Sequence, residues 1–278
     1  MKEKTKKLVK TTKTKKPVKD KKQTTKKPVE VTPHIARIRF LVENYYDIQD
    51  NRMRGESRNR NWVRDYKIKG VEQKVFNENI SVKFKDIETW IYKELGREVK
   101  NHVLWEEWFS KVLGIGPALA GGFIAWIGNI KRFETISKLQ SYCGLACDSD
   151  GNAVRRKKGE SAKWHHKLKS HAWKTAKSFV KTKGKYREYY DKSKKAYQKA
   201  HPKKIFTGNY SITPSGKKKK VFVYTKLHID NMAMRKTVKL FLSHLWVTWR
   251  ELENLPTRSP YPIEKLGHTT YIPPFFDK

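Results

Sequence analysis

The chain has 278 residues, enough for one or two domains with a buried core, and 37% of its residues are hydrophobic. Its 63 Lys and Arg residues against 27 Asp and Glu residues give a formal net charge of +36, which indicates nucleic acid as a partner. Two cysteines imply no disulfide framework, and no segment has the pattern of a signal peptide or of a membrane span. We therefore expect no membrane partner and a reducing compartment.

Residues 1–31 are predicted to form a disordered basic arm of Lys, Thr, Pro and Val repeats. The first 30 residues contain 13 Lys and 3 acidic residues, a net charge of +10, which leaves +26 for the rest of the chain. The folded part is therefore basic in its own right.

Residues 32–111 are predicted to be an N-terminal helical region. Thr32 followed by Pro33 is typical of a helix start, and apolar residues from Ile35 to Tyr46 recur at helical spacing. Two or three further helices are expected over residues 57–112, one ending at Gly96 and the next running from Val103 to Val112.

The stretch Leu113–Pro117 predicts a tight hairpin between two apolar helices. Backbone amides around Gly114 and Gly116 could bind a phosphate, although such a turn can equally be a simple bend. An Ala- and Gly-rich helix is expected over residues 118–127, followed by a short helix that ends at Gly144.

The loop over residues 146–160 is charged, and Ser161 is expected to cap the helix that follows it. One face of that helix is predicted to be buried, through Trp164, Leu168, Ala172, Thr175 and Phe179. The other face is a basic stripe. The residues predicted to bind nucleic acid in this loop and stripe are Arg155, Arg156, Lys158, Lys163, Lys167, Lys174, Lys177 and Lys181.

The predicted fold class is mainly α: a helical bundle with a helix-hairpin-helix element and a small β-hairpin insertion near residues 205–225. Residues 112–255 would form this second region, with a last long helix containing Met234, Phe241 and Trp249. Residues 256–278 contain five prolines and are predicted to be an extended strap.

The order of motifs over residues 112–249 resembles the C-terminal transposase domain of the insertion sequence 110/116/902 family, the bridge-RNA-guided transposases. The matching motifs are Gly114-Ile115-Gly116-Pro117, Ile127-Gly128 with Arg132-Phe133, and Tyr142 with Gly144-Leu145. The resemblance implies DNA transposition by serine-dependent strand exchange, and a cytoplasmic, nucleoid-associated location in a prokaryote or a virus-infected prokaryote.

Members of that family also carry a RuvC-like nuclease domain whose four acidic residues bind catalytic metal ions. Residues 1–111 do not resemble it, so we expect no metal in this chain, and Mg only if a partner chain supplies that domain. The resemblance assigns the nucleophilic serine to Ser149, with Ser161 as a second choice, but Asp148-Ser149-Asp150-Gly151 is also simply a good turn. Whether the chain is an enzyme stays open.

Cys143 and Cys147 with the nearby histidines are a weak match to a zinc site, because the spacing differs from known zinc motifs. Three functions are carried forward. The chain is a transposase-like recombinase that is complete only with a nuclease domain from a partner chain, a non-catalytic binding protein, or a protein that binds a guide or structured RNA. The expected protein partner is a separate nuclease chain or a further copy in a homo-oligomer.

Overall fold

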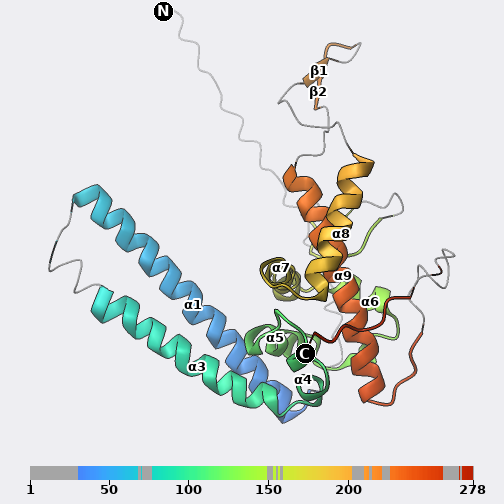
Figure 1. Ribbon diagram of the computed structural model, residues 1–278. Helices are drawn as coiled ribbons and strands as arrows, with labels where there is room; N and C mark the ends of the chain where they lie inside the picture. Colours follow the sequence, from blue (N-terminus) through green and yellow to red (C-terminus); the bar gives the residue numbers. More distant parts are fainter. Residues whose placement is uncertain are drawn as a thin grey trace, which may run out of the picture.

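The computed structural model describes residues 31–67, 70, 77–148, 153–154, 156, 159–201, 210–212, 215–220, 226–258, 269 and 271–277. The chain is mainly helical (Figure 1). The predicted disorder of the basic arm lies outside these residues, except for Val31. Among the described helices, none combines the length and the hydropathy that crossing a bilayer requires.

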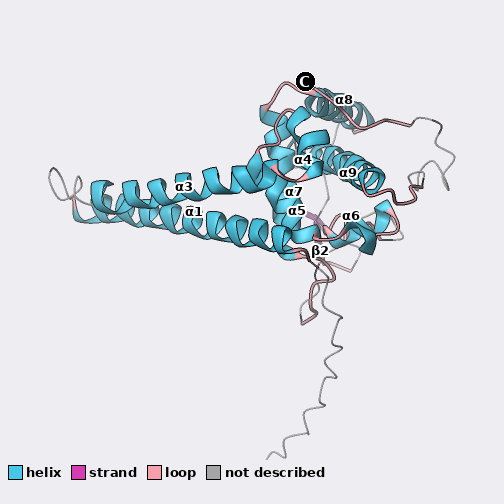
Figure 2. Ribbon diagram, turned by 90° about the horizontal axis from the view of Figure 1, so that it is seen from below, coloured by secondary structure: helices cyan, strands magenta, loops and turns pink. Residues whose placement is uncertain are grey.

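A long pair of helices projects from the rest of the molecule, as Figures 1 and 2 both show. It consists of α1 (Pro33–Tyr66) and α3 (Val82–Lys100), the latter preceded by a π-helical turn, η1 (Asn77–Ser81). The predicted start of α1 is confirmed, because the Thr32 side chain accepts a hydrogen bond from the Ile35 amide. The prediction of a separate helix from residue 57 is wrong, since α1 continues unbroken to Tyr66.

The helix expected to end at Gly96 also continues, to Lys100. Gly96 is buried, and a β-carbon there would lie 3.8 Å from the Pro117 ring. The glycine therefore marks a close contact between helices rather than a helix end.

The single helix expected over Val103–Val112 is broken into α4 (Val103–Glu107) and the 3₁₀ turn η2 (Phe109–Lys111). The break falls at Trp108, whose buried ring stacks on Phe241 and whose indole N–H donates to the Phe275 carbonyl. Tertiary packing thus overrides helical periodicity here, and the described residues do not support the predicted helix-hairpin-helix element.

The central helix α5 (Pro117–Ile127) is the Ala- and Gly-rich segment, and its glycines allow helices to pack on both of its sides. A β-carbon on Gly121 would lie 3.0 Å from Val42 and Val99, on the side of α1 and α3. One on Gly122 would lie 2.3 Å from the buried ring of His171, on the side of α7. The Ala- and Gly-rich helix predicted for this segment is confirmed.

After α5 come η3 (Ile130–Arg132), α6 (Ile136–Tyr142), α7 (His166–Lys181) and α8 (Lys185–Ala200). The predicted end of α6 at Gly144 is confirmed, since Gly144 has φ +70° and the Leu145 amide returns to the Gln140 carbonyl at 2.9 Å. The last helix, α9 (Lys226–Leu252), packs against α4, α6, α7 and α8 and completes the core.

Two short strands, β1 (Tyr210–Ile212) and β2 (Lys218–Lys220), pair antiparallel with Ser211 opposite Lys219. They lie within the predicted insertion at 205–225. The apolar residues on which that prediction rested, 205–206 and 221–224, are outside the described residues.

Residues 271–277 run in an extended conformation across the body. The Ile272 carbonyl accepts a hydrogen bond from His244, and the Asp277 amide donates to the Lys111 carbonyl. The C-terminal segment is thereby fixed to α9 and to η2.

Candidate nucleic-acid interface

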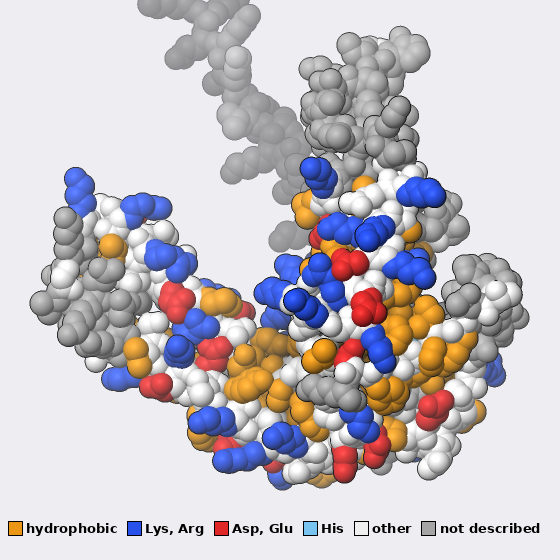
Figure 3. Space-filling view, viewed as in Figure 1, with side chains coloured by type: hydrophobic (Ala, Val, Ile, Leu, Met, Phe, Trp, Pro, Cys, Tyr) orange, Lys and Arg blue, Asp and Glu red, His pale blue; other side chains and the backbone are white. Residues whose placement is uncertain are grey.

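The two faces of α7 differ as the sequence predicts. Leu168, Ala172, Thr175 and Phe179 are buried. The lysines of the predicted stripe are all exposed: Lys163, Lys167, Lys174, Lys177 and Lys181. Figure 3 shows basic side chains gathered over α7 and α8, with a few acidic side chains among them.

The start of α7 differs from the prediction. Ser161 does not cap the helix; His165 does, by accepting a hydrogen bond from the Leu168 amide on Nδ1 at 3.1 Å. Trp164 lies before the helix, where its ring faces the Lys169 ammonium at 3.9 Å, and so it does not extend the buried face.

Two lysines of the stripe are held by α1. Lys167 pairs with Glu43 at 2.8 Å, and the Lys174 ammonium lies 3.6 Å from the centre of the Tyr46 ring. Burial lowers the pKa of Lys174. Among the described residues, Lys163, Lys177 and Lys181 form no ion pair, so their charges face solvent.

The hairpin before α5 is packed against other parts of the chain. A β-carbon on Gly114 would lie 2.9 Å from the Thr182 hydroxyl, and the Gly114 carbonyl accepts a hydrogen bond from Ser178 at 2.6 Å. The neighbouring Leu113 amide donates to the Asp277 carboxylate at 2.9 Å. Phosphate binding by Gly114 and Gly116 stays a prediction. The adjacent Leu113 amide already donates its hydrogen bond to the Asp277 carboxylate.

The loop after α6 is only partly described. Cys147 and Ala153 form an isolated antiparallel bridge. Arg156 is exposed, and its guanidinium donates to the Glu160 carbonyl at 3.1 Å. The predicted nucleophile Ser149 and the predicted binding residues Arg155 and Lys158 lie outside the described residues, so their roles stay predictions.

Cys143 is buried, which raises the pKa of its thiol, whereas Cys147 is exposed. The described residues contain no group of three or more His, Cys, Asp or Glu side chains arranged to hold a metal ion. The weak zinc match therefore gains no support.

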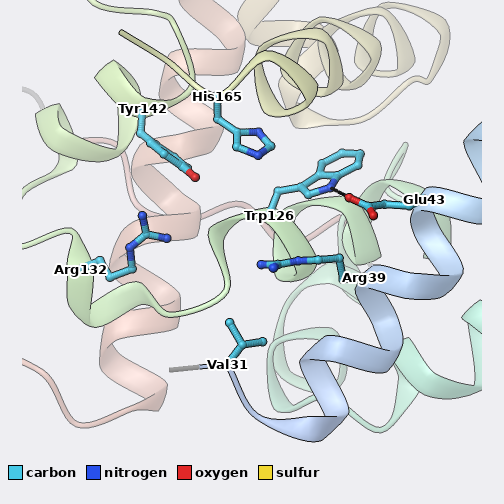
Figure 4. Close-up of a pocket in the computed structure, with 7 residues that line it drawn as sticks. All are labelled: Val31, Arg39, Glu43, Trp126, Arg132, Tyr142 and His165. Atoms are coloured by element: carbon cyan, nitrogen blue, oxygen red, sulfur yellow. Dashed lines mark hydrogen bonds between the residues drawn. The ribbon is translucent and has the colours of Figure 1, made fainter. Parts of the chain in front are cut away.

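A pocket of about 300 Å³ lies beside the start of α7, where five segments converge (Figure 4). α1 contributes Arg39 and Glu43 and α5 contributes Trp126, and the pocket is completed by Val31, Arg132, Tyr142 and His165. In Figure 4 both guanidinium groups, the Tyr142 hydroxyl and the His165 ring point toward its centre.

Both arginines are positioned by the carbonyl end of α5. Arg39 donates to the Ala125 carbonyl through Nε at 3.0 Å and through Nη2 at 2.6 Å, and Arg132 donates to the Ile127 carbonyl at 3.2 Å. These carbonyls belong to the last turn, which has no partners within the helix, and cations are favourable there. The Arg132 guanidinium also lies 5.2 Å from the centre of the Tyr142 ring.

Two titratable groups of the pocket have shifted pKa values. Burial lowers the pKa of His165, and the nearby charges of Arg39 and Lys167 lower it further. Burial alone would raise the pKa of Glu43, but hydrogen bonds from Lys167 and Trp126 and the charge of Lys167 lower it. At neutral pH the pocket therefore contains two guanidinium ions, a neutral imidazole and a carboxylate already paired with Lys167.

Sequence reasoning did not single out this pocket. Arg132 and Tyr142 stand in the motifs that carry the family resemblance, a signal that could have identified them. Arg39 is one of several arginines in α1, and no local pattern distinguishes it from the others.

Residues 106–191 match the family model described as Transposase IS116/IS110/IS902 family. The family resemblance is confirmed over this stretch, which begins in α4, contains the hairpin and all of α7, and ends within α8. No curated protein sequence shows a significant match to the chain. The family match supports a transposition-related function.

Proposed function

We propose that this protein binds DNA and acts in DNA transposition or recombination. The observation that carries the proposal is the family match over residues 106–191, because the same stretch holds the exposed lysines of α7 and four of the pocket residues. The formal charge of +36 supports a polyanionic partner.

The proposal predicts that Lys163, just before α7, and the exposed lysines of α7 neutralise phosphates. A triple variant Lys163→Gln, Lys177→Gln, Lys181→Gln should bind a 30-base-pair duplex at least tenfold more weakly than the wild type. The slope of log K against log salt should fall by about 3, close to one unit for each phosphate contact. Fluorescence anisotropy over a salt series measures both quantities.

The matched control removes the same charge from the exposed face of α3, through Lys83→Gln, Lys85→Gln and Lys93→Gln. This control should retain most of the affinity. An equal loss in both triple variants would mean that the charge acts without a defined site. Tighter binding of single-stranded RNA than of the duplex would favour the RNA-binding alternative.

The chemistry we propose is serine-dependent strand exchange with Ser149 as the nucleophile and a nuclease domain supplied by another chain. The basis is the family resemblance together with the position of Ser149 in a loop whose neighbours include basic residues. Cations beside the reacting phosphate stabilise the charge that develops on it.

Ser149→Ala should abolish any covalent protein–DNA adduct on a nicked, end-labelled duplex, and Ser161→Ala should leave it unchanged. Denaturing gel electrophoresis detects the adduct. An adduct that persists in Ser149→Ala would contradict the assignment. The absence of a wild-type adduct even after a RuvC-like nuclease domain has been added would favour the non-catalytic alternative.

A further inference from the structure

Most of the side chains that line the pocket beside the start of α7 are hydrogen-bond donors. Each guanidinium keeps N–H groups beyond those used on the α5 carbonyls, because Arg39 bonds through Nε and Nη2 and Arg132 through a single nitrogen. These remaining donors point into the pocket (Figure 4).

His165 adds a third donor. Its Nδ1 accepts a hydrogen bond from the Leu168 amide, so in the neutral ring the proton is on Nε2. The Tyr142 hydroxyl points to the same centre from the end of α6. The Glu43 carboxylate, the one acidic side chain among the pocket's lining residues, accepts bonds from Lys167 at 2.8 Å and from the Trp126 indole at 3.4 Å.

Several donors, two of them fixed cations, converge on one space, and this arrangement suits an anion with several acceptor oxygens. Arginine pairs with phosphate in a bidentate geometry, and the first turn of α7 adds its positive end. The volume of about 300 Å³ equals roughly ten water molecules in the liquid, enough for a phosphate group and its attached sugar.

We propose that this pocket binds one phosphate group of a nucleic-acid strand, with Arg39, Arg132, Tyr142 and His165 as its donors. The inference rests on the proposed function and deepens it, since it assigns one phosphate contact of the nucleic-acid strand to this pocket. A strand in the pocket would lie beside Lys163, which precedes α7, and could continue along the exposed lysines of that helix.

Arg132→Gln and Tyr142→Phe test the pocket, and Arg37→Gln is the matched control. Arg37 lies on α1 close to Arg39 in sequence, but it is exposed and pairs with Glu98 at 3.0 Å. Arg132→Lys is added because it keeps the positive charge but removes the planar guanidinium, which can bond a phosphate through two N–H groups. Circular dichroism melting of each variant separates loss of binding from loss of fold.

The probes are the 30-base-pair duplex in anisotropy titrations and inorganic phosphate in isothermal titration calorimetry. We expect duplex affinity to fall about tenfold in Arg132→Gln and about threefold in Tyr142→Phe, with Arg132→Lys between the wild type and Arg132→Gln. Arg37→Gln should change it less than twofold. Inorganic phosphate should bind the wild type weakly and Arg132→Gln not at all.

The outcomes separate the two proposals. Duplex binding that is equal in the wild type, Arg132→Gln and Tyr142→Phe would overturn the pocket while leaving the proposed function intact. A wild type that binds phosphate in an Arg132-dependent way but does not bind the duplex would overturn the proposed function and assign the pocket to a free phosphate compound.

Discussion

The outer half of the α1–α3 arm and the helical body around α5 and α9 are both helical, but they are held together in different ways. In the body, apolar side chains are buried along the full length of α5 and most of α9. In α1, the buried apolar residues Ile35, Ile38 and Val42 all lie in the part next to the body. Farther out on α3, Ile87 and Trp90 are exposed, and the described contacts between the two helices include the ion pair of Arg52 with Glu88.

This difference shows that the length of a helix does not indicate how strongly the rest of the protein stabilises it. A helix whose apolar face is buried gains from packing, whereas the partly exposed ion pairs of the arm each add little. We therefore expect the outer arm to open at a lower free energy than the body.

The largest effect should come from the core. Trp246→Ala removes a fully buried ring whose indole donates to the Phe133 carbonyl at 2.6 Å, and should cost about 4 kcal/mol of unfolding free energy. Trp90→Ala on the arm removes a ring that is 60% exposed, and should cost less than about 0.5 kcal/mol. Chemical denaturation of both variants measures this contrast, and equal losses would contradict it.

Acidification should have the next largest effect, because it lowers the stability of the body. Burial lowers the pKa of His102, His171 and His244 to about 4 from the ordinary value of 6.5. The unfolded chain therefore binds these protons first as the pH falls, and stability is lost between pH 6.5 and 4. Each histidine should cost about 1 kcal/mol at pH 5.5 relative to pH 7.5.

Calorimetric melting at both pH values tests this expectation. His171→Gln keeps a side chain able to donate to the Leu119 carbonyl and cannot titrate, so its melting temperature should fall less on acidification than that of the wild type. An unchanged dependence on pH would exclude His171 as a source of acid sensitivity.

Gly122→Ala should lower the stability of the protein by as much as the acidification does, or by less. The added methyl group would lie 2.3 Å from the His171 ring, which is fixed by a 2.8 Å hydrogen bond to the Leu119 carbonyl. Overpacking of this kind costs about 2 kcal/mol. Gly116→Ala is the control, because its β-carbon has no neighbour closer than 3.4 Å, and its melting temperature should stay near that of the wild type.

The smallest effect should come from the arm itself. Arg52 donates to Glu88 at 2.6 Å and to Glu56 at 2.8 Å. Burial alone would raise the pKa of Glu88, but the hydrogen bonds from Arg52 and Gln49 lower it. Arg52→Met should cost about 1 kcal/mol, seen as faster hydrogen exchange in α1 and α3 and not in α9. Faster exchange throughout the body would show that the arm and the core unfold together.

Local signals in the sequence predicted what depends on neighbouring residues. The Thr32 cap, the end of α6 at Gly144 and the two faces of α7 follow from turn chemistry and helical period, which act over a few residues. The motifs with Gly116, Arg132 and Tyr142 led to the family for the same reason, since they can be read along the chain.

Only the tertiary structure decided which side chains converge. Arg39, rather than Arg37, reaches the pocket because its guanidinium meets a carbonyl 86 residues away. Asp277 lies on the hairpin amide because the C-terminal segment crosses the body. The sequence by itself determined the mainly helical class, the basic charge and the family motifs. The bounds of several helices and the position of the binding groups depended on contacts between distant segments, which local propensity does not encode.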